Sequence, residues 1–103
     1  DWGHARDYVR GMFLALRHDT PDDYVFATGQ LHSVQEVLEQ AFAAVDLDWR
    51  HYVETDPHLL RPAEPLQLVG DPNKARLTLG WSHNTSFTEL IREMTLAELQ
   101  ALE

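Results

Sequence analysis

The sequence predicts a small domain of the mixed α/β (α+β) class, with about four helices and a few short strands. Three observations lead to this prediction. Apolar residues recur every three or four positions in several segments, as in helices that bury one face. Two of these segments begin with Ser-x-x-Glu, the pattern of a helix capping box. Between the helical segments lie short runs of strand-forming residues that end at turn residues.

The first helix is expected over residues 4–18, where apolar side chains fall on one stripe. A polar turn follows at residues 19–23, and Pro21 opposes continuation of the helix because it lacks a backbone N–H. The stripe consists of Ala5, Tyr8, Val9, Met12, Phe13 and Leu16.

Capping boxes mark the start of the second and fourth helices. Ser33 is followed by Glu36 in one, and Ser86 by Glu89 in the other. Each box precedes an apolar stripe that is predicted to face the core. The stripes are Val34, Val37, Leu38, Ala41 and Val45 in the second helix, and Phe87, Leu90, Ile91, Met94 and Ala97 in the fourth.

The remaining elements are short. Residues 24–28 (YVFAT) are a predicted strand, because they are apolar, rich in strand-forming residues and end at Gly29. Residues 49–53 (WRHYV) are predicted as a second strand, because apolar and polar residues loosely alternate there. A third helix is expected between Asp71, which can cap it, and Gly80, which suits its exit. Pro72 fits the first turn of that helix.

The length and composition are those of one small soluble domain over residues 1–103. The chain is 44% hydrophobic and 24% charged, contains no cysteine and has no apolar run long enough to cross a bilayer. It begins abruptly at Asp1, inside a polar motif and without a secretory signal, which suggests a fragment. The lack of cysteine agrees with a cytoplasmic location.

The charge of the chain argues against two classes of partner. Eight Lys and Arg residues stand against 17 Asp and Glu residues, for a formal net charge of −9. Such a surface repels nucleic-acid backbones and anionic membranes. An anionic small molecule can still bind, because one or two arginines can dominate a local cleft.

Most of the machinery of an enzyme is missing from the sequence. The five glycines are scattered, so there is no phosphate-binding loop, and Lys74, the only lysine, has no tyrosine four residues before it. No histidine pair has the spacing of a helical metal site. We therefore expect no catalytic, cofactor-binding or metal-binding residue in this chain.

The stretch from Arg61 to Glu64 (RPAE) is the best candidate for a ligand contact. A guanidinium beside the rigid Pro62 suits a bidentate grip on a diphosphate, and a nearby carboxylate can accept two hydrogen bonds from a ribose diol. The competing interpretation is an Arg–Glu pair on a solvated loop, which contributes little to stability.

Polar and aromatic residues elsewhere have a structural and a functional interpretation. His4 and Asp7 open the first helix, where capping and the helix dipole explain them more simply than catalysis does. Trp2, Trp49 and Trp81 could stack on a base or a sugar, but core packing with a satisfied N–H is the commoner role.

Several motifs, in order, resemble the GDP-mannose 4,6-dehydratases, a family of extended short-chain dehydrogenase/reductase enzymes. The resemblance covers nearly the whole chain, and the motifs are more specific together than singly. They are residues 1–9 (DWGHARDYV), 23–29 (DYVFATG), 32–34 (HSV), 60–64 (LRPAE), 70–75 (GDPNKA), 79–81 (LGW) and 87–94 (FTELIREM).

The resemblance implies that the chain is the C-terminal substrate-binding domain of such an enzyme, without the NADP-binding Rossmann domain. The complete enzyme would be a lyase of nucleotide-sugar metabolism, including GDP-fucose biosynthesis. It would convert GDP-mannose to GDP-4-keto-6-deoxymannose, with NADP as a transient hydride carrier. By the same resemblance, Arg61 would hold the GDP diphosphate and Glu64 the nucleotide ribose. The fragment alone would be inactive.

Two other functions remain open at this point. The chain could be the substrate domain of another sugar-nucleotide enzyme, such as an epimerase or a reductase. It could instead be a stand-alone domain that binds a partner without catalysis. Leu96 and Leu99 lie off the expected inner stripe of the fourth helix, so they are candidates for contact with a missing domain or with a second copy in a homo-oligomer.

Overall fold

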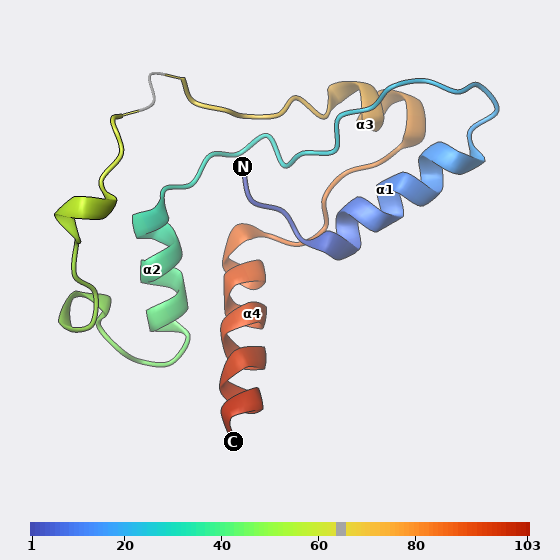
Figure 1. Cartoon of the computed structure of the whole chain (residues 1–103). Helices are drawn as coiled ribbons and strands as arrows, with labels where there is room; N and C mark the ends of the chain where they lie inside the picture. The colour runs from blue at the N-terminus through green and yellow to red at the C-terminus, as the bar shows by residue number, and fades with distance from the viewer. Residues whose placement is uncertain (64–65) are drawn as a thin grey trace.

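The computed structural model describes residues 1–63 and 66–103 of this chain. The four α-helices in these ranges are α1 (Ala5–Arg17), α2 (Val34–Ala43), α3 (Asn73–Leu79) and α4 (Phe87–Leu102), and two short 3-10 helices are η1 (Trp49–His51) and η2 (Pro57–Leu59). Figure 1 shows α2 beside α4, and α1 near α3. Long irregular segments join the helices.

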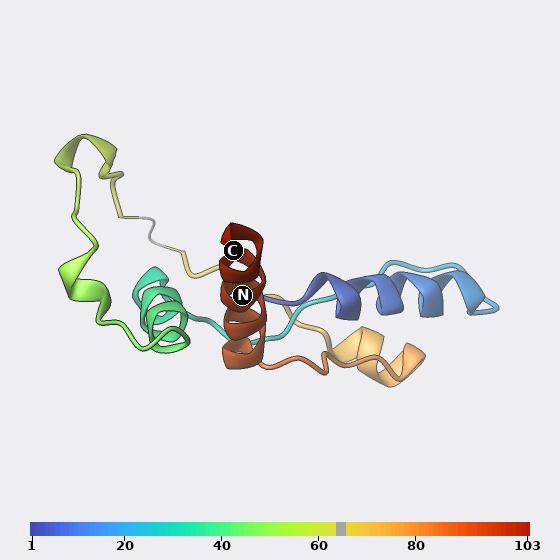
Figure 2. The ribbon, with the colours of Figure 1, turned by 90° about the horizontal axis from the view of Figure 1, so that it is seen from below.

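The molecule is flat and open. In Figure 2, α4 stands between α2 on one side and α1 with α3 on the other. The principal extents are 53 × 38 × 17 Å, and the radius of gyration is 17.1 Å. A compact domain of this length would have a radius of gyration of about 13 Å. Much of the apolar surface therefore has no cover within the described chain.

The predicted α/β class is wrong, because the described residues form helices and contain no β-strand. Residues 24–28 are outside any helix, but no backbone hydrogen-bond ladder pairs them with another described segment. A strand needs such a partner, and strand-forming side chains cannot replace it.

The second predicted strand, residues 49–53, contains the 3-10 helix η1 instead. The Asp48 carboxylate accepts a hydrogen bond from the N–H of Arg50 at 3.0 Å, and the N–H of Tyr52 donates to the carbonyl of Trp49 at 3.0 Å. The predicted strand at residues 49–53 is therefore wrong, because local capping by Asp48 decides the backbone conformation and the loose alternation of side chains does not.

Both predicted capping boxes are confirmed. At the start of α2, Ser33 accepts from the N–H of Glu36 at 3.1 Å, and the Glu36 carboxylate accepts from the N–H of Ser33. At the start of α4, the N–H of Glu89 donates to the Ser86 hydroxyl at 3.2 Å, and the N–H of Ser86 donates to the Glu89 carboxylate at 2.9 Å. These bonds from Ser86 lower the pKa of Glu89.

The third helix, α3, ends as predicted and begins slightly differently. Gly80 adopts the left-handed conformation with φ 66°, which a glycine reaches at no steric cost. The N-cap position is Pro72, without a side-chain cap, while Asp71 accepts a hydrogen bond from the N–H of Asn73 at 2.9 Å. Asp71 therefore supports the first helical residue from outside the helix.

The best-packed region surrounds Trp81, which is fully buried. Its ring contacts Phe26 edge to face at 5.0 Å and stacks on Tyr8 at 6.4 Å between ring centroids. Gly11 of α1 permits this packing, because a Cβ there would lie 2.7 Å from the Phe26 ring. The buried apolar residues of the described chain are Ala27, Ala75, Trp81, Leu90 and Ile91.

The apolar stripes expected to be buried are largely exposed. On α1 the buried positions are Asp7 and Gly11, so the helix packs through its polar and small face. The α2 stripe is at most half-buried, whereas Leu90 and Ile91 of α4 are buried as predicted. The exposed apolar residues of α1 are Val9, Met12, Phe13 and Leu16. No described helix has the length and apolar character to span a bilayer.

Candidate functional site

Arg61, the predicted diphosphate contact, lies in the irregular segment after η2. Asp56 caps that 3-10 helix by accepting from the N–H of His58 at 2.9 Å, and the N–H of Leu60 donates to the carbonyl of Pro57. Arg61 follows directly and is exposed. It makes no hydrogen bond or ion pair with any residue that the structure describes, so its guanidinium donors can reach a ligand.

Glu64, the predicted ribose contact, lies outside the described residues. Its separation from Arg61 is therefore not part of the geometry, and its assignment remains a prediction from the sequence. Arg61 alone represents the predicted site in the described chain.

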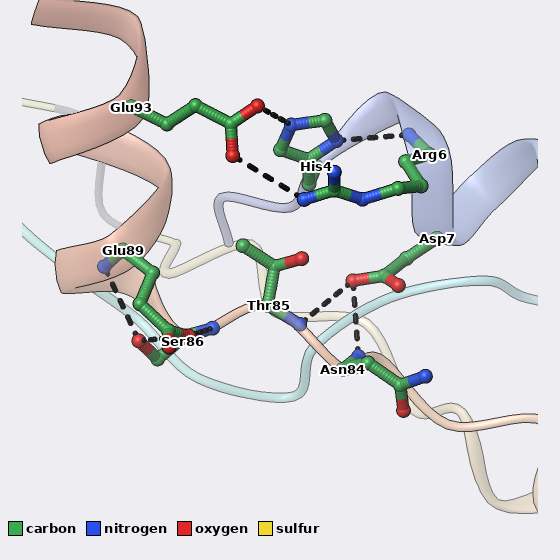
Figure 3. Close-up of polar contacts among 8 residues, drawn as sticks. All are labelled: His4, Arg6, Asp7, Asn84, Thr85, Ser86, Glu89 and Glu93. Carbon is green, nitrogen blue, oxygen red and sulfur yellow. Dashed lines mark hydrogen bonds and ion pairs between the residues drawn. The ribbon is translucent and has the colours of Figure 1, made fainter. Parts of the chain in front are cut away.

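A second group of polar residues joins the start of α1 to α4 (Figure 3). The Nδ1 atom of His4 accepts a hydrogen bond from the N–H of Arg6 at 3.0 Å, so His4 caps α1. The neutral ring therefore carries its proton on Nε2, which lies 3.3 Å from Glu93. The guanidinium of Arg6 lies 3.3 Å from the other carboxylate oxygen of Glu93. These contacts support the capping interpretation of His4.

Asp7 forms the buried part of the same junction. One oxygen of its carboxylate accepts from the backbone N–H groups of Asn84 and Thr85, each at 3.0 Å, as Figure 3 shows. The other oxygen lies 3.6 Å from Arg10, and the carbonyl of Asp7 accepts from the Trp81 ring N–H at 2.8 Å. Asp7 thus ties α1 to the segment that leads into α4.

The charge of Asp7 is stabilised in this environment. Burial by itself raises the pKa of Asp7, but the hydrogen bonds from Thr85 and Asn84 and the nearby charge of Arg10 outweigh it. The pKa of Asp7 lies below its ordinary value as a result. An ionised carboxylate with three such partners is a structural anchor and is poorly suited to accept a proton at neutral pH.

Two open clefts lie near these residues. A cleft of about 360 Å³ borders the His4–Glu93 contacts, and its arginines and glutamates offset each other's charge. Another of about 370 Å³ lies between residues 28–30 and the start of α3. The first is lined by Arg6, Asn84, Thr85, Glu89, Arg92, Glu93 and Leu96. Arg61 lines neither cleft.

The described residues do not fit NADP. Gly29 and Gly70 meet, but their N–H groups already donate to the carboxylate of Asp1, which leaves them closed to a phosphate. Lys74 is 2.8 Å from Asp22 and is thereby paired. Within the part of the chain that the structure covers, no group of His, Asp and Glu side chains is arranged to hold a metal ion.

Sequence reasoning missed the long-range roles of Asp1 and Asp7. The sequence suggested that Asp7 interacts with the dipole of its own helix. In the structure its carboxylate accepts hydrogen bonds from the N–H groups of Asn84 and Thr85, more than seventy positions away. The signal in the sequence was an aspartate among apolar helical positions, one helical turn before Gly11, where the Phe26 ring approaches the helix closely. Asp1 gave no such signal.

Comparison with known proteins decides which family these motifs represent. The family model described as GDP-mannose 4,6 dehydratase matches residues 1–94. The chain belongs to the GDP-mannose 4,6-dehydratase family. This match confirms the resemblance noted in the sequence and favours a dehydratase over an epimerase or a reductase.

Curated relatives give the extent of the likeness. A GDP-mannose 4,6 dehydratase of Dictyostelium discoideum is 40% identical over all of this chain and 34% of its own length. GDP-mannose 4,6 dehydratase 2 of Arabidopsis thaliana is 44% identical over 97% of this chain and 27% of its own length. A GDP-mannose 4,6 dehydratase of Homo sapiens is 37% identical over 99% of this chain and 32% of its own length. The chain spans about a third of the length of these relatives.

Proposed function

We propose that residues 1–103 form the substrate-binding domain of a GDP-mannose 4,6-dehydratase. The observation that carries this proposal is the family match over residues 1–94, in a chain about a third as long as its relatives. The complete enzyme is a cytoplasmic lyase that removes water from GDP-mannose to give GDP-4-keto-6-deoxymannose. NADP, held by a separate nucleotide-binding domain, supplies the transient hydride acceptor.

Within this domain Arg61 binds the diphosphate of GDP-mannose and Glu64 binds the nucleotide ribose. The exposed guanidinium of Arg61, without a partner in the described chain, supports the first assignment. A planar guanidinium can donate two parallel hydrogen bonds to phosphate oxygens, and these are among the stronger polar contacts in proteins. Such a contact acts at hydrogen-bonding distance, so it is compatible with the net charge of −9 of the whole chain.

The exposed apolar surface supports a partner for the domain. Phe13 and Leu16 of α1 are 56% and 86% exposed, and Leu99 of α4 is 43% exposed. On α1 the exposed apolar residues recur every three or four positions, and an apolar helix face of this kind is usually covered by another protein surface. We assign the α1 surface to the NADP-binding domain, and Leu99 to that domain or to a second copy in a homo-oligomer.

Replacing Arg61 by alanine in the full-length dehydratase should weaken GDP-mannose binding. Loss of a charge-assisted bidentate contact costs about 1.5–3 kcal/mol, which is roughly a tenfold to 150-fold higher dissociation constant. Isothermal titration calorimetry with GDP-mannose measures it. Arg50→Ala, which removes an exposed arginine of η1 that pairs with Asp48, is the matched control and should leave the affinity unchanged. Equal affinities for Arg61→Ala and wild type would remove Arg61 from the site.

The 103-residue chain by itself should produce no GDP-4-keto-6-deoxymannose from GDP-mannose and added NADP. The reason is that the N–H groups of Gly29 and Gly70 and the amine of Lys74 are engaged in structural contacts. Mass spectrometry of the sugar nucleotides checks this expectation, with a full-length dehydratase as the positive control. Product from the chain alone would place the chemistry within these residues and contradict the proposal.

A further inference from the structure

Helix α1 has two opposite faces, and the apolar face is the one that the described chain leaves open. Asp7 and Gly11 are its buried positions, and Gly11 meets the Phe26 ring. Because successive helical residues are about 100° apart, Val9 and Leu16 lie about 180–200° around the helix from Asp7. In Figure 1, α3 lies on one side of α1, and the other side of α1 faces no part of the described chain. The helix is therefore packed through one face and carries its apolar stripe on the other.

The chain as a whole exposes more surface than its length requires. Its solvent-accessible area is 8213 Å². A compact monomer of this size exposes about 6,000 Å². The excess of about 2,200 Å² is well above the roughly 800 Å² that each partner buries in an interface of standard size. An excess of this size corresponds to one side of a permanent interface, in which two surfaces together form a core.

The chemistry of the α1 face fits such an interface. Its centre consists of Val9, Met12, Phe13 and Leu16, which are apolar and exposed. A charged group lies at its edge, where the guanidinium of Arg17 is 5.3 Å from the centroid of the Phe13 ring. An apolar centre with a polar rim is typical of protein interfaces. The partner that fits this face is therefore another apolar protein surface.

The part of a dehydratase chain that lies outside residues 1–103 is the occupant that these observations favour. The chain spans 34% of the Dictyostelium discoideum relative and 32% of the Homo sapiens relative, so about two thirds of such a protein lies outside it. A second copy of this region fits the face less well, because it would bring a second net charge of −9 against the first.

We propose that α1 is a central helix of the complete dehydratase, and that the NADP-binding part of the same chain permanently covers its apolar face. This inference rests on the proposed function, in which residues 1–103 are about a third of such an enzyme, and it adds the character of the contact. With Asp7 and Gly11 packed on one side and Phe13 on the other, α1 belongs to a core that both parts share. Because large apolar interfaces suppress domain motion, the two parts move as one body at this helix.

The test is a photo-crosslink from the α1 face of the full-length dehydratase. Phe13 is replaced by p-benzoylphenylalanine, the folded enzyme is irradiated, and the products are separated on a denaturing gel and mapped by mass spectrometry. We expect a product with the mass of one chain, in which residue 13 is joined to the NADP-binding part. A product of two chains, a crosslink confined to residues 1–103, or no crosslink would each overturn the proposal.

The same probe in place of Arg50 is the matched control. Arg50 is an exposed residue of η1 that pairs with Asp48, so a probe there should not crosslink to the NADP-binding part. Equal yields of that crosslink from both positions would overturn the assignment, because the reach of the probe would then explain the result without any cover of α1.

Oxidation of Met12 in the unmodified full-length enzyme tests the same cover without a substitution, and it decides the matter if the Phe13 variant does not fold. Met12 is 57% exposed in the described chain. Since a permanently covered thioether reacts slowly, we expect hydrogen peroxide to oxidise Met12 at least about tenfold more slowly in the folded enzyme than in guanidinium chloride. A smaller difference would mean that the face is open or opens often, which would overturn the permanent interface.

Neither measurement uses GDP-mannose, so this inference and the proposed function can fail separately. If Phe13 crosslinks as expected but the full-length protein does not convert GDP-mannose, the proposed function is wrong and the cover of α1 by the rest of the chain stands. If the protein converts GDP-mannose but Met12 is oxidised as fast as in the unfolded chain, only the inference about α1 is wrong.

Discussion

Replacing Trp81 by alanine should lower the free energy of unfolding of this chain by about 3–5 kcal/mol. The side chain of Trp81 is fully buried and packs against Tyr8 and Phe26. Its truncation therefore leaves a cavity between these two rings. It also removes the ring N–H that donates to the carbonyl of Asp7 at 2.8 Å. Because small domains are stable by only about 5–15 kcal/mol, this loss consumes much of the total.

Urea denaturation followed by circular dichroism at 222 nm measures the effect of Trp81→Ala. Trp81→Phe is the informative companion variant, because it keeps an aromatic ring in the site and loses the hydrogen bond to Asp7. It should cost clearly less than the alanine variant. Equal stability of Trp81→Ala and wild type would mean that the aromatic cluster with Phe26 does not hold α1 to the segment after α3.

The helices of this chain could be predicted because their signals are local. The two capping boxes at Ser33 and Ser86 are closed by residues three positions away, and the exit of α3 at Gly80 depends on one glycine. Each of these features depends on residues within about one helical turn of each other. The structure confirms all three.

The strands and the buried faces could not be predicted in the same way, because both depend on partners distant in the sequence. Residues 24–28 have strand-forming side chains, but no described segment pairs with their backbone. The sequence periodicity correctly predicts a helix at α1, but the buried positions of this helix are Asp7 and Gly11 and not its apolar stripe. Periodicity identifies an apolar face and does not say which surface covers it.

The residues of the candidate site also differ in whether a local sequence pattern reveals them. Arg61 was identified by residue type and motif, and its exposure agrees with a ligand contact without testing the role. The structural role of Asp1 could not be read from the sequence, because it depends on the meeting of Thr28, Gly29 and Gly70. A side chain that binds a ligand leaves a local pattern, whereas one that organises loops acts through contacts visible only in three dimensions.

Replacing Asp7 by alanine should lower the free energy of unfolding by about 2–5 kcal/mol, because the N–H groups of Asn84 and Thr85 lose a charged acceptor. The Thr85 donor is buried, so water does not readily replace the carboxylate. Urea denaturation measures the loss. Asp48→Ala is the matched control: it removes an exposed aspartate that caps only η1, and should cost about 1 kcal/mol. Similar losses for the two variants would show that Asp7 is no more than a local cap.

The effect of Asp7 should also depend on pH with a defined sign. The pKa of Asp7 in the folded chain lies below its ordinary value of 3.8, so the unfolded chain takes up the proton first as the pH falls. The stabilisation by Asp7 is therefore complete at pH values well above 3.8 and declines as the pH falls below it towards the folded-state pKa. The difference in unfolding free energy between wild type and Asp7→Asn, an uncharged isostere, should be constant near neutral pH and shrink in acid. A constant difference down to the acid range would mean that the hydrogen bonds from Asn84 and Thr85 do not depend on the charge.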